Sequence, residues 1–170
     1  IDAGGNPVVT TTCVPFGEVA DYCVGKFDGA NGNPVFSTLL ASGRSFLPYH
    51  VGIAPPRISL DAGGNLFVAG TCQAGSRRRF CTFKLNSAGV SQWTSYFDGS
   101  GDNTVHSLAL DPSGNPIVTG ECEAAAGNMD ACTVKLNGAS GALSWSHVYG
   151  GGGAYAGEAG LKVKTDAAGH

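Results

Sequence analysis

The chain has few charged residues and no long apolar run, and these two absences narrow its class. Charged residues make up 14% of the 170 positions, and 10 Lys and Arg against 13 Asp and Glu leave a formal net charge of −3. This balance supplies no basic field for nucleic acid and no polybasic membrane patch. Because no apolar run of about 18 residues occurs, we predict no membrane span. The N-terminus shows neither a signal peptide nor an initiator Met, so we expect mature or excised material.

Helical periodicity over long segments is absent as well. The chain carries 27 Gly and 8 Pro, and in a helix interior Gly costs about 1 kcal/mol and Pro about 3 kcal/mol relative to Ala. Few segments could sustain a helix under these conditions. The composition therefore favours an all-β fold.

The sequence also lacks the short motifs that mark common catalytic and metal sites. It has no Gly-x-Ser-x-Gly elbow and no His-Glu-x-x-His zinc motif. No Cys-x-x-Cys pair occurs, and the His residues at positions 50, 106, 147 and 170 share no spacing with the thiols. We therefore assign no catalytic, metal-ligating or cofactor-binding residue, and we predict a protein that is not an enzyme and needs no cofactor.

What the chain does contain is a repeat. Its first copy reads Asp-Ala-Gly-Gly-Asn at residues 2–6, and related boxes occupy residues 61–65, 111–115 and 166–170. The four box Asp residues are separated by 59, 50 and 55 residues, a period typical of multi-stranded units that stack side by side. The repeated turn-motif residues are Asp2 and Gly5, Asp61 and Gly64, Asp111 and Gly114, and Asp166 and Gly169.

Each unit also repeats internally, as four short runs that alternate with a period of two. In one run Cys81, Phe83 and Leu85 fall on one face while Thr82 and Lys84 fall on the other. Residues 132–136 repeat this pattern in the next unit. Such alternation is typical of half-buried antiparallel strands. We predict one repeat region over residues 1–170, with units that start near residues 2, 61 and 111.

The Asp boxes have two interpretations, a hairpin turn and a calcium loop. In the third box, Asp111 can accept a hydrogen bond from a backbone N–H two residues on, and Gly114 can supply the left-handed residue that a bulged hairpin needs. A calcium ion takes six to eight oxygen ligands, and each box offers about two. We favour the turn.

Six cysteines occur as two per unit, at the end of the second run and the start of the third. If these runs form a hairpin, the pairs are Cys13 with Cys23, Cys72 with Cys81, and Cys122 with Cys132. Closing a loop of about ten residues contributes roughly 2.7 kcal/mol per bridge in the chain-entropy account. Disulfides indicate an oxidising compartment, so we expect a secreted or cell-surface protein.

One segment carries a family resemblance. Residues 108–120 read Leu-Ala-Leu-Asp-Pro-Ser-Gly-Asn-Pro-Ile-Val-Thr-Gly, followed by Cys-Thr-Val-Lys-Leu at 132–136 and Ala-Leu-Ser-Trp-Ser at 142–146. This pattern resembles the bacterial SBBP (seven-bladed β-propeller) repeat family, in a variant with paired cysteines and about three units. The resemblance covers nearly the whole chain. It implies propeller blades of four antiparallel strands in exported proteins, with no shared catalytic residues.

The order of the runs predicts a strand offset between the two termini. The first unit lacks its first strand, and residues 161–165, with Leu161 and Val163, could supply that strand and complete a blade. Three blades are too few for one propeller, which typically has four to eight. We expect self-association into a ring or a filament, or neighbouring blades in a larger chain.

Three local features depart from the repeat. Arg77, Arg78 and Arg79 occupy the loop expected between Cys72 and Cys81, where sister loops carry acidic residues. A solvated loop is favoured over complementary charge, and both remain open.

The long connection at residues 42–56 includes Phe46 and Tyr49 and could cover a neighbouring subunit, line a ligand groove or pack on its own blade. The Gly run at 150–153 is interpreted as a linker. The candidate interface residues are the three arginines, Phe46, Tyr49, Leu161 and Val163.

Two functions fit these observations. The first is a non-enzymatic extracellular structural or adhesive module that assembles through blade and terminal-strand contacts. The alternative is a carbohydrate-binding propeller, suggested by the aromatic residues Trp93, Trp145, Tyr96, Tyr149 and Tyr155. Both Trp lie inside alternating strands, so we predict that they belong to the core.

Overall fold

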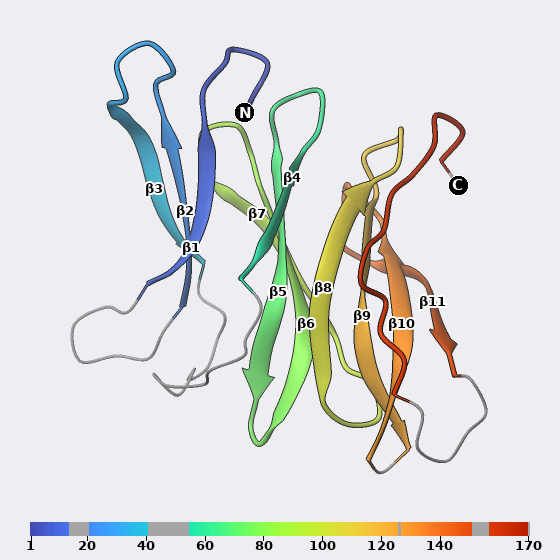
Figure 1. The fold of residues 1–170 in the computed structure, drawn as a ribbon. Helices are drawn as coiled ribbons and strands as arrows, with labels where there is room; N and C mark the ends of the chain where they lie inside the picture. The colour runs from blue at the N-terminus through green and yellow to red at the C-terminus, as the bar shows by residue number, and fades with distance from the viewer. Residues whose placement is uncertain (14–20, 41–54, 126, 151–156, 170) are drawn as a thin grey trace.

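The computed structural model describes residues 1–13, 21–40, 55–125, 127–150 and 157–169. These residues form eleven β-strands and no helix, in three antiparallel sheets (Figure 1). The first sheet contains β1 (Val8–Cys13), β2 (Asp21–Phe27) and β3 (Pro34–Leu40). The second contains β4 (Arg57–Leu60), β5 (Leu66–Ala74), β6 (Arg77–Leu85) and β7 (Ser91–Phe97). The third contains β8 (Asn103–Leu110), β9 (Pro116–Ala125), β10 (Asn128–Leu136) and β11 (Leu143–Tyr149).

The predicted all-β class is confirmed, and the strand order follows the sequence within every sheet. Neighbouring strands in each sheet are neighbours in the chain, so every sheet is a simple meander of hairpins. None of the three sheets closes on itself within the described ranges. The sheets stand side by side in chain order (Figure 1).

Two apolar layers hold the sheets together. One lies between the first and second sheets and includes Tyr22, Val68 and Phe83. The other lies between the second and third sheets and includes Phe80 and Val118. The middle sheet is thus covered on both faces, and seven consecutive residues of β5 are buried. The expectation of half-buried strands fails there because a neighbouring sheet replaces solvent on each side.

All three predicted disulfides are present in the structure. They join Cys13 to Cys23, Cys72 to Cys81, and Cys122 to Cys132, with Cα–Cα distances of 5.9, 5.8 and 5.7 Å. Each bridge links two adjacent strands of one sheet. Intramolecular bridges of this kind are consistent with an oxidising, extracellular environment.

No helix in the described ranges has the length and apolar character needed to cross a membrane.

The segment after the third sheet differs from the sequence prediction. Residues 161–165, predicted as a strand, are irregular in the structure. They run along the third sheet (Figure 1), where the Val163 N–H donates to Ser107 Oγ and the Thr165 hydroxyl donates to the Leu110 carbonyl. These contacts use the Ser107 side chain and a single carbonyl of β8, so this segment and β8 form no regular backbone ladder in the described residues.

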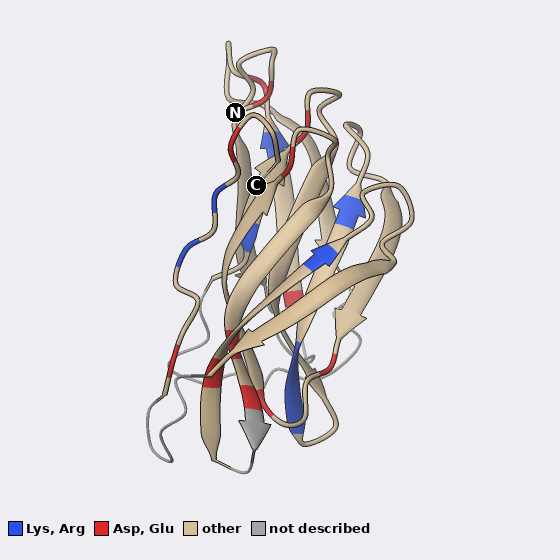
Figure 2. Ribbon diagram, turned by 90° about the vertical axis from the view of Figure 1, so that its right-hand side faces the viewer, with Lys and Arg blue, Asp and Glu red and all other residues tan. Residues whose placement is uncertain are grey.

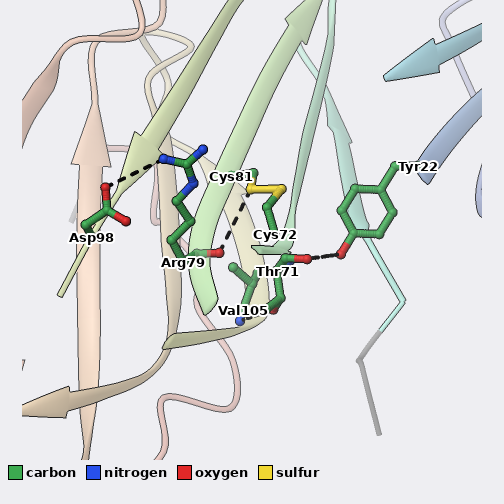
Figure 3. The surroundings of a disulfide bond; sticks show 7 residues. All are labelled: Tyr22, Thr71, Cys72, Arg79, Cys81, Asp98 and Val105. Atoms are coloured by element: carbon green, nitrogen blue, oxygen red, sulfur yellow. Dashed lines mark hydrogen bonds and ion pairs between the residues drawn. A yellow bond between two sulfur atoms is a disulfide. The ribbon is translucent and has the colours of Figure 1, made fainter. Parts of the chain in front are cut away.

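Tyr22 makes the most buried polar contact between the first two sheets. Its hydroxyl donates to the Thr71 carbonyl at 2.8 Å and accepts from the Thr71 N–H at 2.9 Å (Figure 3). The side chain is fully buried, and burial raises the pKa of Tyr22 to about 12. This hydroxyl therefore stays neutral and satisfies both backbone groups of one residue in the neighbouring sheet.

Replacing Tyr22 by Phe should lower the free energy of unfolding by about 1–3 kcal/mol, because two buried backbone groups lose their partner. Urea unfolding followed by fluorescence measures this change. Tyr96→Phe is the matched control, since Tyr96 is 40% exposed, and it should change the value by less than about 0.5 kcal/mol. Equal effects of the two substitutions would contradict the assigned role.

Candidate functional site: the contact between neighbouring sheets

The contact between the first and second sheets places aromatic rings of one sheet on glycines of the next. The Phe36 ring of β3 lies against Gly89, where an added Cβ would approach it to 2.5 Å. Beside it, the Thr38 hydroxyl donates to the Gly89 carbonyl at 2.8 Å. Deeper in the contact, the Tyr22 ring occupies the space that a Cβ on Gly70 would need. The sheets approach closely because these positions carry no side chain.

The same arrangement recurs between the second and third sheets. The Trp93 ring lies against Gly141, where an added Cβ would come within 2.7 Å of the indole. The Trp93 Nε1–H donates to the Gly138 carbonyl at 3.2 Å, and Lys84 Nζ donates to the same oxygen at 2.7 Å. Phe80 lies 3.1 Å from the position of a Cβ on Gly120. Trp93 and Phe36 are equivalent in the repeat, as are Phe80 and Tyr22.

Backbone and amide groups of β8 complete this second contact. The Val105 N–H donates to Thr71 Oγ1 at 2.9 Å. The side-chain amide of Asn103, which is buried, donates to the Arg78 carbonyl at 2.9 Å. These bonds fasten the first strand of the third sheet to the face of the second sheet.

The segment after β11 contacts the third sheet through backbone hydrogen bonds. The Glu158 N–H donates to the Met129 carbonyl at 2.8 Å, and the Gly160 N–H donates to the Gly120 carbonyl at 3.0 Å. When the box residues Asp111 and Asp166 are aligned, Glu158 matches Asn103 and Gly160 matches Val105. Met129 likewise matches Arg78 when the second cysteines of the two units are aligned. The tail, residues 157–169, therefore docks on the third sheet at the place where β8 docks on the second. Its bonds differ in their groups, because the tail donates two backbone N–H groups to backbone carbonyls, whereas the β8 contact uses the side chains of Asn103 and Thr71.

The Asp boxes form turns in the structure. In the second box, one carboxylate oxygen of Asp61 accepts from the Asn65 N–H and the other from the Asn65 side-chain amide, at 2.9 and 2.8 Å. Asp2 and Asp111 make the same bonds in their own boxes. Gly5, Gly64, Gly114 and Gly169 all have positive φ, between 74° and 89°. The last box thus adopts the turn conformation of the other three.

Two of the box carboxylates are also paired with lysine. Lys26 Nζ lies 2.6 Å from Asp2, and this ammonium, with the amides of Asn6 and Gly4, holds the pKa of the Asp2 carboxyl well below its usual range. Lys135 Nζ lies 2.8 Å from Asp111. Burial raises the pKa of Asp111, but the hydrogen bonds from Lys135 and Asn115 outweigh it and lower the pKa to about 2. The carboxylate oxygens of Asp2 and Asp111 therefore accept hydrogen bonds from their own turn and pair with a lysine of the same unit.

The three arginines are strand residues, which corrects the predicted loop. They begin β6, after a turn of two residues that follows β5. Arg78 pairs with Asp102 through its backbone N–H and guanidinium, at 2.8 and 3.1 Å. Arg79 stacks on the Tyr96 ring at 3.7 Å and lies 3.8 Å from Asp98. Figure 2 shows basic and acidic residues together at this end of the molecule.

The arginines therefore have partners within the chain. Their hydrogen-bond and ion-pair partners lie in the connection between β7 and β8, and the stacking partner of Arg79 lies in β7. The sequence analysis favoured a solvated loop and named the acidic residues of the sister hairpins as the alternative partners. It missed Asp98 and Asp102 because they lie outside the aligned runs, and only the fold brings them beside β6.

The exposure of the two Trp side chains also corrects the sequence prediction. Trp93 is half-buried, because the third sheet covers part of it. Trp145 is 45% exposed, although it occupies the equivalent strand position. Of the other candidate interface residues, Leu161 is exposed and Val163 is half-buried. Phe46, Tyr49 and Tyr155 lie outside the described residues.

One open pocket of about 440 Å³ lies between the second and third sheets. Its lining includes Phe97, Cys122 and Glu123. The Glu123 carboxylate accepts from the backbone N–H groups of Gly127 and Asp102, and these bonds lower its pKa. The Glu123 carboxylate oxygens therefore fix the backbone at Gly127 and Asp102. In the part of the chain that the structure describes, no group of three His, Cys, Asp or Glu residues could hold a metal ion.

No family model matches the sequence, and no curated protein matches it.

The Lys135–Asp111 pair gives a prediction about acid stability. A carboxyl whose pKa is lower in the folded state stabilises the fold above its unfolded pKa, near 3.8, and loses that contribution as the pH falls towards about 2. The unfolding free energy of the wild type should therefore fall between about pH 4 and pH 2, and Asp111→Asn should fall less steeply there. Urea titrations at several pH values measure the slope.

Asp61→Asn is the control for this experiment. Asp61 occupies the same box position, but the equivalent lysine, Lys84, donates to Gly138 in the next sheet. This variant removes a box carboxylate without removing a lysine pair, so it should change the acid-dependent slope less than Asp111→Asn does. A slope that is unchanged in Asp111→Asn would contradict the prediction.

Proposed function

We propose that this chain is a non-enzymatic structural or adhesive repeat module that works by stacking one sheet on the next. The observation that carries the proposal is the recurrence of one docking contact. The first sheet docks on the second and the second on the third through matching aromatic and glycine positions. The tail adds the backbone part of the same contact on the far face of the third sheet.

The sheets are the blades of a β-propeller or of a related open stack. Each complete unit supplies four strands, and the described part of the first sheet supplies three. The tail lies where the first strand of a following blade would lie, as its bonds to Gly120 and Met129 indicate. The resemblance to the SBBP repeat family implies blades of this kind. Closure into a ring, growth into a filament and continuation in a longer propeller all use this same position.

We place this function outside the cell or on the cell surface. The three disulfides each lock a hairpin within one sheet, and such bonds persist in oxidising compartments. In the described residues, both charge signs are distributed along the stack (Figure 2).

Carbohydrate binding is the second candidate, and the exposure of two aromatic residues on β11 favours it. Trp145 is 45% and Tyr149 is 65% exposed, and alternation along the strand puts both on one face. Aromatic faces of this kind can stack on sugar rings. Titration of the protein with a panel of oligosaccharides, monitored by Trp fluorescence, separates the two functions. A structural module should show no saturable change, and a saturable change that Trp145→Ala removes would replace our proposal with the second candidate.

The docking of the tail can be tested with two glycine substitutions. A Cβ on Gly160 would collide with the Thr119 hydroxyl, whereas a Cβ on Gly157 would meet only the Met129 carbonyl at 3.8 Å. Gly160→Val should therefore detach the tail, and Gly157→Val should leave it in place. Hydrogen exchange of the Gly160-region amides, read by mass spectrometry of the tail peptide, should be at least about tenfold faster in Gly160→Val, since its closing bonds are lost.

The unfolding free energy provides a second measurement on the same two variants. Detachment exposes Thr119 and the face around it, so Gly160→Val should be the less stable protein. Equal exchange rates in the wild type and in Gly160→Val would mean that the tail does not dock, and the proposed stacking function would lose its main support.

A further inference from the structure

Three equivalent aromatic residues occupy the outer strands of the three sheets, and one of them has no neighbouring sheet in the described structure. Phe36 pairs in register with Lys26, Trp93 with Lys84, and Trp145 with Lys135. Phe36 and Trp93 lie on glycines of the following unit. Trp145 occupies the same place on the third sheet and is 45% exposed.

Three equivalent glycines form the complementary surface. Gly32, Gly89 and Gly141 each end the turn before the last strand of their sheet, and each Gly N–H donates to the carbonyl of the residue that opens the turn. The turn that ends at Gly89 is one residue shorter than the other two. Their φ angles are 73°, 80° and 74°. Gly89 receives Phe36 and Gly141 receives Trp93, but an added Cβ on Gly32 meets nothing within 4 Å. The set of three rings and three glycines thus leaves one ring and one glycine unused, at opposite ends of the stack.

We propose that Trp145 of one copy of this chain docks on the Gly32 turn of a second copy, so that subunits associate head to tail. This inference rests on the proposed stacking function and names its partner. The new contact continues the two contacts already present within the chain. Both end faces also carry exposed apolar side chains, with Val9 and Leu39 on the first sheet and Tyr149 beside Trp145 on the third.

The tail lies where the strand before β1 of a second copy would lie if its first sheet stacked on the third sheet. In the second and third sheets, the strand before the Asp box pairs with the strand after it. The described part of the first sheet ends at β1, with no strand beyond it. The register of β8 on β9, applied to the tail, sets Lys164 opposite Val8 of the second copy. The tail's box then falls on the Asp2 box of that copy, so residues 161–165 supply the fourth strand only when one of the two boxes leaves this position.

This contact uses different surfaces on the two partners. An association of that kind continues until the rotation between subunits closes a ring, or it builds an open filament. Blocking the two surfaces separately therefore has a distinctive consequence. Each blocked variant keeps one working surface and should pair only with the variant that keeps the other.

The test uses Trp145→Ala, which removes the ring, and Gly32→Asn, which places a side chain where the ring docks. Asn is the substitute because it tolerates positive φ better than other side chains. Gly75→Asn is the matched control, since Gly75 also has positive φ and open space around its Cβ. Tyr96→Ala is the control for loss of a partly exposed aromatic residue.

Sedimentation velocity over a range of concentrations gives the readout. The wild type, Gly75→Asn and Tyr96→Ala should form species larger than the 17.2 kDa chain. Trp145→Ala and Gly32→Asn should each associate at least about tenfold more weakly, as expected for truncation at the centre of an interface. An equimolar mixture of these two variants should give a dimer that grows no further. A monomeric wild type, undiminished association of either variant, or a mixture that stays monomeric would each overturn the proposal.

A thermal unfolding measurement distinguishes failure of the head-to-tail proposal from failure of the proposed stacking function. Trp93→Ala removes the equivalent ring inside the chain and should lower the melting temperature. If it does so while Trp145→Ala leaves association unchanged, stacking holds and the second copy is the wrong partner. If Trp93→Ala has no effect, the stacking function itself is wrong.

Discussion

The arrangement of the three sheets depends on the need to cover the apolar face of each sheet with the next sheet. A meander of three or four short strands cannot bury both of its faces alone, and the units of repeat proteins solve this by stacking. Here the middle sheet is buried on both sides, and it supplies residues to both apolar layers. Of its neighbours, the first sheet has one covered face, and the tail covers part of the far face of the third sheet. Within the described residues, the stack therefore ends in two faces that differ from each other.

Glycine allows the sheets to approach, and aromatic rings fill the space that glycine leaves. Gly70 and Gly120 lie in equivalent strands and receive the rings of Tyr22 and Phe80. A larger residue at Gly70 would push the sheets apart, and one at Gly120 would collide with the Thr104 carbonyl of its own sheet and crowd Phe80. The Tyr22 ring adds a polar function, because its hydroxyl satisfies Thr71 inside the apolar layer. Close packing and hydrogen bonding thus act at the same point of the contact.

The disulfides and Asp boxes act within each sheet and prepare it for stacking. A bridge ties the second and third strands of a unit, and a box closes the turn before them. Lys135 and Lys26 fix the box carboxylates of their own units. Lys84 instead reaches the Gly138 carbonyl of the following unit. One repeated lysine therefore stabilises a turn in two units and a contact between sheets in the other.

The sequence alone determined the features that depend on local spacing: the all-β class, the period of the units and the pairing of Cys72 with Cys81. These follow from alternation, turn chemistry and short loops, which need no knowledge of distant residues. The tertiary structure decided the burial of Thr82, the exposure of Trp145, the partners of Arg78 and the course of residues 161–165. Each of these depends on which sheet lies beside the residue, and Trp93 and Trp145 show the consequence: in matching strand positions, one is covered by a neighbour and the other is not.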